Sequence, residues 1–365
     1  MSNNTQLRVM VMAGGTGGHV FPALAVVEQL CISKCLVTWL GTRAGIEAEL
    51  VPQQNIPLYF ITIEGVRGKG FLALLKAPIL LWRSISQALL ILAECKPQVV
   101  LGMGGFASGP GIVAAWIKRI PVIIHEQNAV AGTTNRLGAY FAKRILQAFP
   151  DTLPRGEWCG NPVRHEICAL KLPKERFKDR SGKLRLLVLG GSRGALAINT
   201  LLPKTLALID PEIRPQVFHQ TGRDHYESTS RLYAAENLSI ENPDIRVVPF
   251  IERMEKAYDW ADFVICRAGA LTISELMSSG IGALLVPFPF AIDDHQTANG
   301  QFLVDHRAAE MIQQADLTND QLASFITQIA IDTELRLEMA INARSLAQTN
   351  AASYVAHACE EIANE

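Results

Sequence analysis

The chain has 365 residues and a formal net charge of −1 at pH 7, which gives no electrostatic reason to expect a nucleic-acid partner. Hydrophobic residues make up 49% of the chain and charged residues 19%, so it can bury one large core or two smaller ones. Its 7 cysteines contain no CxxC pair and fit free thiols better than a disulfide framework. The first residues lead directly into an expected strand and have neither a basic region nor a cleavage site, so no secretory signal is expected there.

Short apolar runs alternate with helical patterns along the whole chain. This alternation predicts an α/β fold in which parallel sheets carry helices on both faces. The runs are almost continuously apolar, as expected for strands that are covered on both sides. The expected strands are residues 9–12, 37–40, 58–63, 99–103, 122–125, 145–148, 186–189, 216–220, 245–248, 263–266 and 283–286.

Two segments of the chain begin alike: residues 7–18 read LRVMVMAGGTGG and residues 184–195 read LRLLVLGGSRGA. Each apolar run enters a glycine-rich turn and then a helical segment. This is a ready anion site, because free backbone N–H groups meet the positive end of the helix dipole there. The repeat predicts two nucleotide-type halves facing one another across a cleft, with a hinge at 159–164 and a solvated charged connector at 171–183.

The glycine loops match neither of the two common cofactor folds. The first loop does not have the GxGxxG spacing, and residues 37–42 end without the carboxylate that binds ribose in dinucleotide folds. A P-loop needs Lys followed by Ser or Thr, where this chain has His19 and Val20. A third glycine cluster at 102–111 indicates either close backbone approach to a ligand or tight turns alone.

His19 stands between the first glycine loop and the expected helix. The field of a helix N-terminus disfavours the imidazolium, so a neutral His19 near pH 7 can accept a proton as a general base. The same field lowers its basicity. The alternative is a histidine that only orders the loop.

Two polar segments in the second half suggest ligand contacts. Residues 270–275 open a helix after an expected strand, where amides suit phosphate and Glu275 suits the hydroxyls of a ribose; an ordinary exposed first-turn acid is the alternative. The DDHQTAN run at 293–299 favours sugar hydroxyls over a metal, since its spacing fits no standard metal site. Residues 125–128 form a similar polar cluster.

Residues 71–92 have the length and much of the apolar composition of a membrane span. The polar residues Lys76, Arg83 and Gln87 and the internal Pro78 argue against a spanning helix. Preceding basic residues and the internal Trp82 are typical of an interfacial membrane helix. From the residues alone, a core helix of the first half is an equal alternative.

Seven motifs together carry a resemblance that runs from about residue 8 to 355. They are AGGTGGHVFPALA, GMGGFASGP, HEQNAVAGTTN, GNPVR, GGSRGA, CRAGALTISE and DDHQTAN. In this order they resemble the MurG family, the N-acetylglucosaminyltransferases that make lipid II in bacterial peptidoglycan synthesis. The resemblance implies two Rossmann-like α/β domains facing a cleft (the GT-B architecture). Residues 1–162 would bind acceptor and membrane, 163–341 would bind UDP-GlcNAc, and a C-terminal helix at about 342–365 would pack back on the first domain.

The resemblance also implies roles for individual residues, with His19 at the position of the family's candidate base. The implied donor-binding residues are Thr16, Gly17, Gly18, Asn128, Arg164, Ser192, Ile251, Ala270, Leu271, Thr272, Ile273, Ser274, Glu275 and Gln296. The implied membrane patch comprises Lys69, Phe71, Leu75, Trp82 and Arg83. The chain departs from the family pattern at Arg193, where Gln is usual and where the extra cation would alter donor affinity, and at Ala107, where Val is usual.

The implied reaction is an inverting transfer of GlcNAc from UDP-GlcNAc to the C4 hydroxyl of the MurNAc unit of lipid I. It would need no obligatory cofactor, with a divalent metal at most a stimulant, and would take place at the cytoplasmic face of the bacterial inner membrane. A UDP-GlcNAc 2-epimerase, an NAD-dependent oxidoreductase, a non-catalytic donor-binding protein and a transferase for another glycolipid are the competing hypotheses.

Overall fold

The computed structural model describes residues 6–63, 71–191, 194–238 and 243–365, with side chains of the helix at 71–95 described from residue 77 onward. The chain divides into two compact units, Met1–Arg164 with Gln348–Glu365, and His165–Ala347. The division follows Arg164 rather than residue 162, and Arg164 places its guanidinium over the ring of Phe21 in the first unit. Residues 342–347 stay with the second unit, where Arg344 donates to the carbonyl of Cys168.

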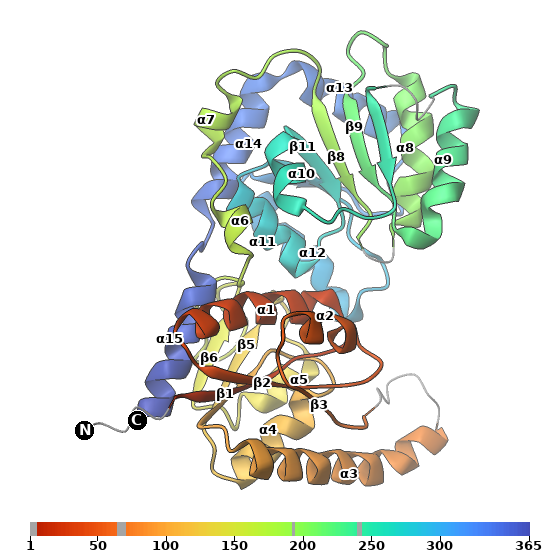
Figure 1. The fold of residues 1–365 in the computed structure, drawn as a ribbon. Coiled ribbons are helices and arrows are strands. Elements are labelled where there is room, and N and C mark those ends of the chain that lie inside the picture. The colour runs from red at the N-terminus through yellow and green to blue at the C-terminus, as the bar shows by residue number, and fades with distance from the viewer. Residues whose placement is uncertain (1–5, 64–70, 192–193, 239–242) are drawn as a thin grey trace. The chain divides into compact units, whose positions relative to one another are not determined.

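The first unit is a parallel seven-stranded sheet with strand order β3-β2-β1-β4-β5-β6-β7 and helices on both faces (Figure 1). Its elements are β1 (Arg8–Met12), α1 (Gly17–Ile32), β2 (Leu36–Gly41), α2 (Glu47–Gln53), β3 (Leu58–Phe60), α3 (Phe71–Cys95), β4 (Val99–Gly102), α4 (Ser108–Ile117), β5 (Val122–Glu126), α5 (Thr133–Gly138), β6 (Arg144–Gln147), β7 (Glu157–Trp158) and α15 (Ala351–Asn364).

The second unit is a parallel six-stranded sheet with order β10-β9-β8-β11-β12-β13. Its elements are α6 (His165–Cys168), α7 (Pro173–Phe177), β8 (Arg185–Leu189), α8 (Leu196–Leu208), β9 (Gln216–Gln220), α9 (Tyr226–Ala235), β10 (Ile245–Val248), α10 (Met254–Trp260), β11 (Phe263–Cys266), α11 (Ala270–Ser279), β12 (Ala283–Leu285), α12 (His295–Asp305), β13 (Ala309–Met311), α13 (Asn319–Ile331) and α14 (Thr333–Ser345), with single 3₁₀ turns at Arg223–His225 and Ile292–Asp294.

Alternate residues of β1 enter two different cores. Val9 and Val11 pack with α1 and α15 on one face, whereas Met10 and Met12 pack with α3 and α4 on the other. A strand alternates its side chains between faces, so a strand covered on both sides must be apolar throughout. In the second unit, Leu186 and Val188 of β8 enter a core built with α8 and α13.

The expected strands are confirmed in position, and the differences from expectation have local causes. Strands β7 and β13 were not expected, since the first has only two exposed residues and the second carries Glu310 at its centre. The connector at 171–183 was expected to be solvated, but it forms α7 and buries Pro173, Arg176 and Phe177. Arg176 and Phe177 follow Pro173 by three and four positions, so the three lie on one side of the helix, while Lys174 and Glu175 face water.

Candidate active site

In the first unit, three polar segments meet at the carboxyl edge of the sheet. They follow β1, β4 and β5, which are neighbours in the sheet, and the chain reverses its strand order between β1 and β4. Such a switch point is where open parallel sheets bind ligands. The glycine cluster after β4 has φ of 92° at Gly104 and 83° at Gly105, and a Cβ on Gly105 would lie 2.1 Å from the carbonyl oxygen of Gly14. These two glycines therefore allow the loop after β4 to lie against the loop after β1.

Glu47 fixes the first glycine loop from within. Its carboxylate is fully buried and accepts from the N–H of Gly15 at 2.9 Å and from the N–H and hydroxyl of Thr42, both at 2.8 Å. A buried carboxylate is stable only when its oxygens are hydrogen-bonded in this way. Glu47 brings a carboxylate to the end of β2, but the carboxylate is engaged by the loop and is not exposed to bind a ribose.

His19 is the third residue of α1, which begins at Gly17 with Thr16 at the N-cap. Its Nδ1 lies 2.9 Å from Oε1 of Gln127, in the loop after β5. Gln127 in turn contacts His125, whose side chain is fully buried, and this burial lowers the pKa of His125 to about 4. His19 is half-buried, and its Nε2 has no hydrogen-bond partner among the described residues.

The loop that follows β5 is held by a second buried carboxylate. Glu126 accepts from the backbone N–H of Asn128 at 2.9 Å, from the N–H of Gly132 at 3.1 Å and from the side-chain amide of Asn135 at 2.9 Å. Asn128 is half-buried at the same edge of the sheet as His19. Thus Thr16, Gly17, Gly18, His19 and Asn128 share one edge of the first unit, where the N–H groups of Gly17 and Gly18 have no partner among the described residues.

In the second unit, the glycine loop after β8 is tied down by an amide. Gln220, at the end of β9, accepts from the N–H of Gly191 and donates to the carbonyls of Gly191 and Pro249. It links this loop to the segment after β10 that holds the buried Ile251. The predicted Ser192 and the departure at Arg193 lie outside the described residues.

Helix α11 begins at Ala270, directly after β11, with Gly269 at the N-cap. Ala270, Ile273, Ser274 and Glu275 are buried, and Leu271 and Thr272 are half-buried. Glu275 is 6% exposed, and Oε2 accepts from the hydroxyl of Tyr258 at 3.0 Å. The alternative of an exposed first-turn acid is therefore wrong: this carboxylate is held in place within the fold.

The polar run after β12 is shaped by two strained residues. Asp293 and Asp294 have φ of 53° and 50°, a conformation that favours glycine. They turn the chain into α12, where Oε1 of Gln296 accepts from the N–H of Phe288 at 2.9 Å. Among the described residues, no three His, Cys, Asp or Glu side chains gather as a metal site would require. Ile251, residues 270–275 and Gln296 thus all follow carboxyl ends of strands in the second sheet.

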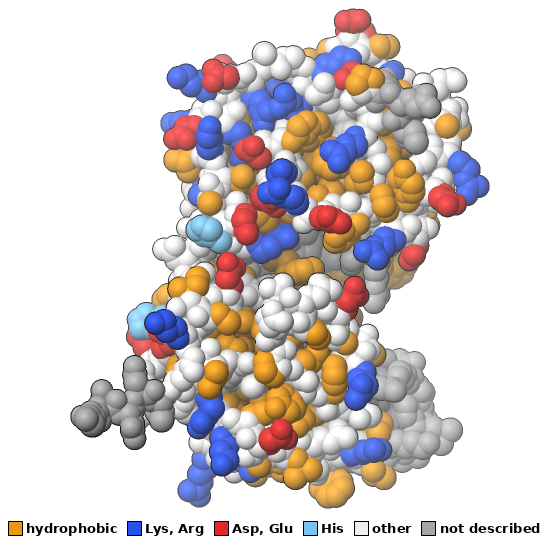
Figure 2. Space-filling model, viewed as in Figure 1, with side chains coloured by type: hydrophobic (Ala, Val, Ile, Leu, Met, Phe, Trp, Pro, Cys, Tyr) orange, Lys and Arg blue, Asp and Glu red, His pale blue; other side chains and the backbone are white. Residues whose placement is uncertain are grey.

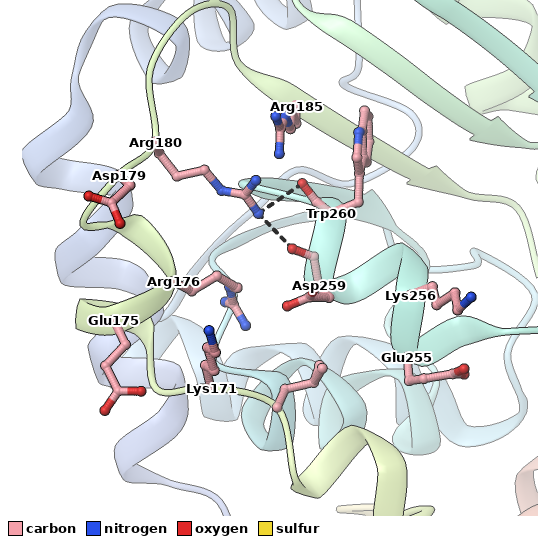
Figure 3. A pocket seen from close by; sticks show the side chains of 11 residues that line it. Lys171, Glu175, Arg176, Asp179, Arg180, Arg185, Glu255, Lys256, Asp259 and Trp260 are labelled. Atoms are coloured by element: carbon pink, nitrogen blue, oxygen red, sulfur yellow. Dashed lines mark hydrogen bonds between the residues drawn. The ribbon is translucent and has the colours of Figure 1, made fainter.

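A cavity of about 650 Å³ opens elsewhere in the second unit, at the amino end of β8 (Figure 3). Figure 3 shows Arg180 reaching the backbone carbonyls of Asp259 and Trp260, at 2.6 and 3.2 Å. Arg176 donates to the carbonyls of Ser279 and Gly280 at the end of α11. Both arginines thus donate hydrogen bonds to the last carbonyls of a helix, Arg180 at the end of α10 and Arg176 at the end of α11. The cavity lies at the amino edge of the sheet, opposite to the glycine loop. We therefore do not assign it to the nucleotide.

Helix α3 buries one narrow stripe, Ser84, Ala88 and Leu92, and exposes large apolar side chains on its other faces. Trp82 is 71% exposed and Leu90 is 72% exposed. The segment Ala77–Cys95 is long and apolar enough to cross a membrane, judged by length and composition alone, and 17% of it is buried. Figure 2 shows apolar side chains along the edge where Figure 1 draws α3. Arg83 is exposed, Lys69 lies outside the described residues, and so do the side chains of Phe71 and Leu75.

Several residues that shape these edges were not predicted from the sequence, notably Glu47, Gln127 and Gln220. Their contacts join positions far apart in the chain: 32 positions separate Gly15 from Glu47, and 108 separate His19 from Gln127. The sequence does offer one weak signal, since Gln127 and His125 belong to a polar cluster at the end of an apolar strand.

Comparison with known proteins matches both units. Residues 9–147 match the glycosyltransferase family 28 N-terminal domain, and residues 185–357 match the glycosyltransferase family 28 C-terminal domain. The chain is 49% identical over 361 residues to the UDP-N-acetylglucosamine--N-acetylmuramyl-(pentapeptide) pyrophosphoryl-undecaprenol N-acetylglucosamine transferase of Nitrosococcus oceani, covering 98% of this chain and 99% of the relative. It is 50% identical over 364 residues to the protein of the same name from Cellvibrio japonicus, with the same coverage. The crystal structure of Acinetobacter baumannii MurG has a TM-score of 0.84 and 43% identity, covering 97% of this chain and 99% of that one.

Proposed function

Because this chain belongs to glycosyltransferase family 28, we propose that it transfers N-acetylglucosamine from UDP-N-acetylglucosamine to the C4 hydroxyl of the N-acetylmuramyl unit of lipid I. The product is lipid II, which carries a new β-1,4 bond and serves peptidoglycan synthesis. This role would link the enzyme to cell wall biogenesis, cell shape and cell division. The observation that carries the proposal is near-half identity over 98% of the chain to transferases named for this donor and acceptor.

We assign donor binding chiefly to the second unit. The N-terminus of α11 and the glycine loop before α8 direct backbone N–H groups and helix dipoles at a diphosphate. The buried carboxylate of Glu275 would accept from the ribose hydroxyls, Ile251 would meet the uracil and Gln296 would bind the sugar. Ser192 and Arg164 complete the proposed donor contacts. Stabilisation by amides and helix ends would make a divalent metal unnecessary for the departure of UDP.

We assign acceptor activation to the first unit. Nε2 of His19 takes the proton of the C4 hydroxyl, whose oxygen attacks C1 of the donor sugar. As the C4–O–C1 bond forms, the bond from C1 to the β-phosphate oxygen breaks and its electron pair leaves with UDP. One attack from the opposite side inverts C1. The N–H groups of Gly17 and Gly18 would hold the acceptor diphosphate at the start of α1, and Asn128 and Thr16 would contact the donor.

The experiment that tests this proposal is UDP release from UDP-N-acetylglucosamine, with and without a lipid I analogue, in detergent with a chelator. We expect release only when the acceptor is present. Release without acceptor would instead indicate a 2-epimerase or a hydrolase. Binding without any release would indicate a donor-binding protein, and release with another glycolipid alone would move the proposal to that acceptor.

We also propose that the enzyme is peripheral, at the cytoplasmic face of the inner membrane, where α3 contacts an anionic surface. The support is the exposure of Trp82, Ile79 and Leu90 on a helix that also exposes Arg83. Apolar side chains enter the interface while cations meet anionic headgroups.

Vesicle binding tests this membrane contact directly. Replacing both Trp82 and Leu90 by Ser should lower cosedimentation with phosphatidylglycerol-containing vesicles by about tenfold or more, given the apolar area removed. The matched control is Ile331→Ser, which removes an apolar side chain that is 65% exposed in the second unit and should change nothing. Equal loss in both variants would reject α3 as the contact.

A further inference from the structure

Four groups in the first unit form a continuous hydrogen-bonded chain from the backbone to His19. The carbonyl of Gly160 lies 2.9 Å from Nε2 of His125, and Nδ1 of His125 lies 3.2 Å from Nε2 of Gln127. Oε1 of Gln127 lies 2.9 Å from Nδ1 of His19. The direction of every bond in this chain follows from its fixed end.

The fixed end is the carbonyl of Gly160, which can only accept. Nε2 of His125 must therefore carry the proton that it donates to Gly160. Burial lowers the pKa of His125 to about 4, so the ring is neutral near pH 7 and has a single N–H. Its Nδ1 consequently presents a lone pair and must receive a hydrogen bond from Gln127.

The orientation of the Gln127 amide is settled by a second contact. Nε2 of Gln127 also donates to the backbone carbonyl of His125, at 3.0 Å. Both amide hydrogens are thus used, one on Nδ1 of His125 and one on its carbonyl. A flipped amide would place its oxygen against that carbonyl oxygen and against a lone pair, which are two repulsive contacts. Oε1 must therefore face His19, and as an acceptor it requires a proton on Nδ1 of His19.

We infer that Gln127 and His125 are positioning residues that select one tautomer of the neutral His19 ring, with its proton on Nδ1 and its lone pair on Nε2. This inference rests on the proposed function, because Nε2 is the atom to which we assign the acceptor proton. We call the hydrogen-bonded chain through His125 and Gln127 the relay. Its backbone is held by two side chains: Asn161 donates to the carbonyl of Gln127 at 3.0 Å, and Asn135 donates to the carbonyl of His125 at 3.0 Å. Tautomer control of this kind lets a histidine act as a base without an ionised partner.

The tautomer can be read directly by NMR on the full chain labelled with ¹⁵N-histidine, without any substrate, at mildly alkaline pH. The signals of His19 are assigned by their loss in His19→Gln. We expect Nδ1 of His19 to show the shift of a protonated ring nitrogen and Nε2 that of an unprotonated one. The opposite pattern, or averaged shifts at both nitrogens, would overturn the inference.

Gln127→Leu removes both links of the relay at nearly constant volume. We expect the His19 signals to move to the averaged shifts of a tautomer mixture, and kcat to fall about tenfold or more while KM for the donor stays constant. The matched control is Gln53→Leu, at an exposed position of α2, which should leave both readouts unchanged. An unchanged His19 spectrum in Gln127→Leu would also overturn the inference.

The two claims fail separately in this design. The proposed reaction fails if no transfer occurs, whatever the spectrum shows. The relay fails if the tautomer is wrong in an enzyme that does transfer.

Discussion

The two units begin with nearly the same strand and glycine loop, but they hold the loop with side chains of different charge. In the first unit the carboxylate of Glu47 accepts a hydrogen bond from the N–H of Gly15. In the second unit the neutral amide of Gln220 accepts one from the N–H of Gly191. Both side chains come from outside the loop. Equal topology therefore does not mean equal electrostatics at the ligand edge.

This difference suggests a division of labour. The carboxylate of Glu47 beside the first loop offsets part of the attraction of the Gly17 and Gly18 N–H groups for the acceptor diphosphate. The neutral amide of Gln220 leaves the field of the second loop undiminished for the donor diphosphate. The first unit instead has a histidine in the opening turn of its helix, backed by a neutral relay. We expect the second unit to dominate donor affinity and the first to dominate the chemical step.

The largest expected effect is that of His19→Ala in the first unit. Loss of a general base should lower kcat by about 100- to 10,000-fold. Donor affinity should change far less, because we assign it chiefly to the second unit. Steady-state kinetics with the lipid I analogue and calorimetric titration with UDP-N-acetylglucosamine separate the two quantities. Nearly unchanged turnover would remove His19 from the base role.

Acid should destabilise both units through one buried histidine in each. Burial lowers the pKa of His125 to about 4 and that of His219 to about 3, against an ordinary value of 6.5. The unfolded state therefore binds more protons below pH 6.5, and the free energy of unfolding falls as the pH drops from 6.5 toward these values. At about 1.4 kcal/mol for each pKa unit, His125 alone contributes a loss of about 3 kcal/mol by pH 4.

Pulse proteolysis in urea at a series of pH values measures this loss, with fragments assigned to each unit by mass spectrometry. His125→Gln should flatten the acid slope of the first unit and leave that of the second. His357→Ala, at an exposed histidine of α15, is the control and should leave both slopes as they are. A pH-independent stability over this window would contradict the burial argument.

Glu275→Ala tests the second unit as the donor site. Removing a buried charged acceptor should weaken UDP-N-acetylglucosamine binding by about 1.5–3 kcal/mol, or roughly tenfold to a hundredfold. The control Glu334→Ala changes an exposed acid of the same unit and should bind donor normally. Donor affinity that survives Glu275→Ala would remove the ribose role.

The smallest expected effect comes from exchanging the charge of Glu47 and Gln220, the two side chains that hold the glycine loops. Gln220→Glu places a negative charge beside the second loop and should weaken UDP binding by about tenfold. Glu47→Gln removes the charge from the first loop and should leave UDP affinity within about twofold, at a cost in stability of about 1–3 kcal/mol. If Glu47→Gln altered UDP affinity as much as Gln220→Glu, the proposed division of labour would be wrong.

The sequence predicts the architecture well because apolar runs such as 186–189 and 263–266 must be covered on both faces. It misses β13, whose three residues include a glutamate. It misreads the connector because three consecutive charged residues separate the buried Pro173 and Phe177 of α7. In the structure, the motif residues follow the carboxyl ends of strands in both sheets. They do not reveal Glu47 or the relay through Gln127, since those contacts arise only when distant strands become neighbours in the sheet.

The most direct test of the account is the structure of the product made from UDP-N-acetylglucosamine and a lipid I analogue, determined by NMR after separation of the lipid. The account predicts one N-acetylglucosamine joined to C4 of the muramyl sugar in a β linkage, with one UDP released for each bond formed. An α linkage would contradict inversion with His19 as base. Consumption of donor without a lipid-linked disaccharide would contradict the transferase assignment itself.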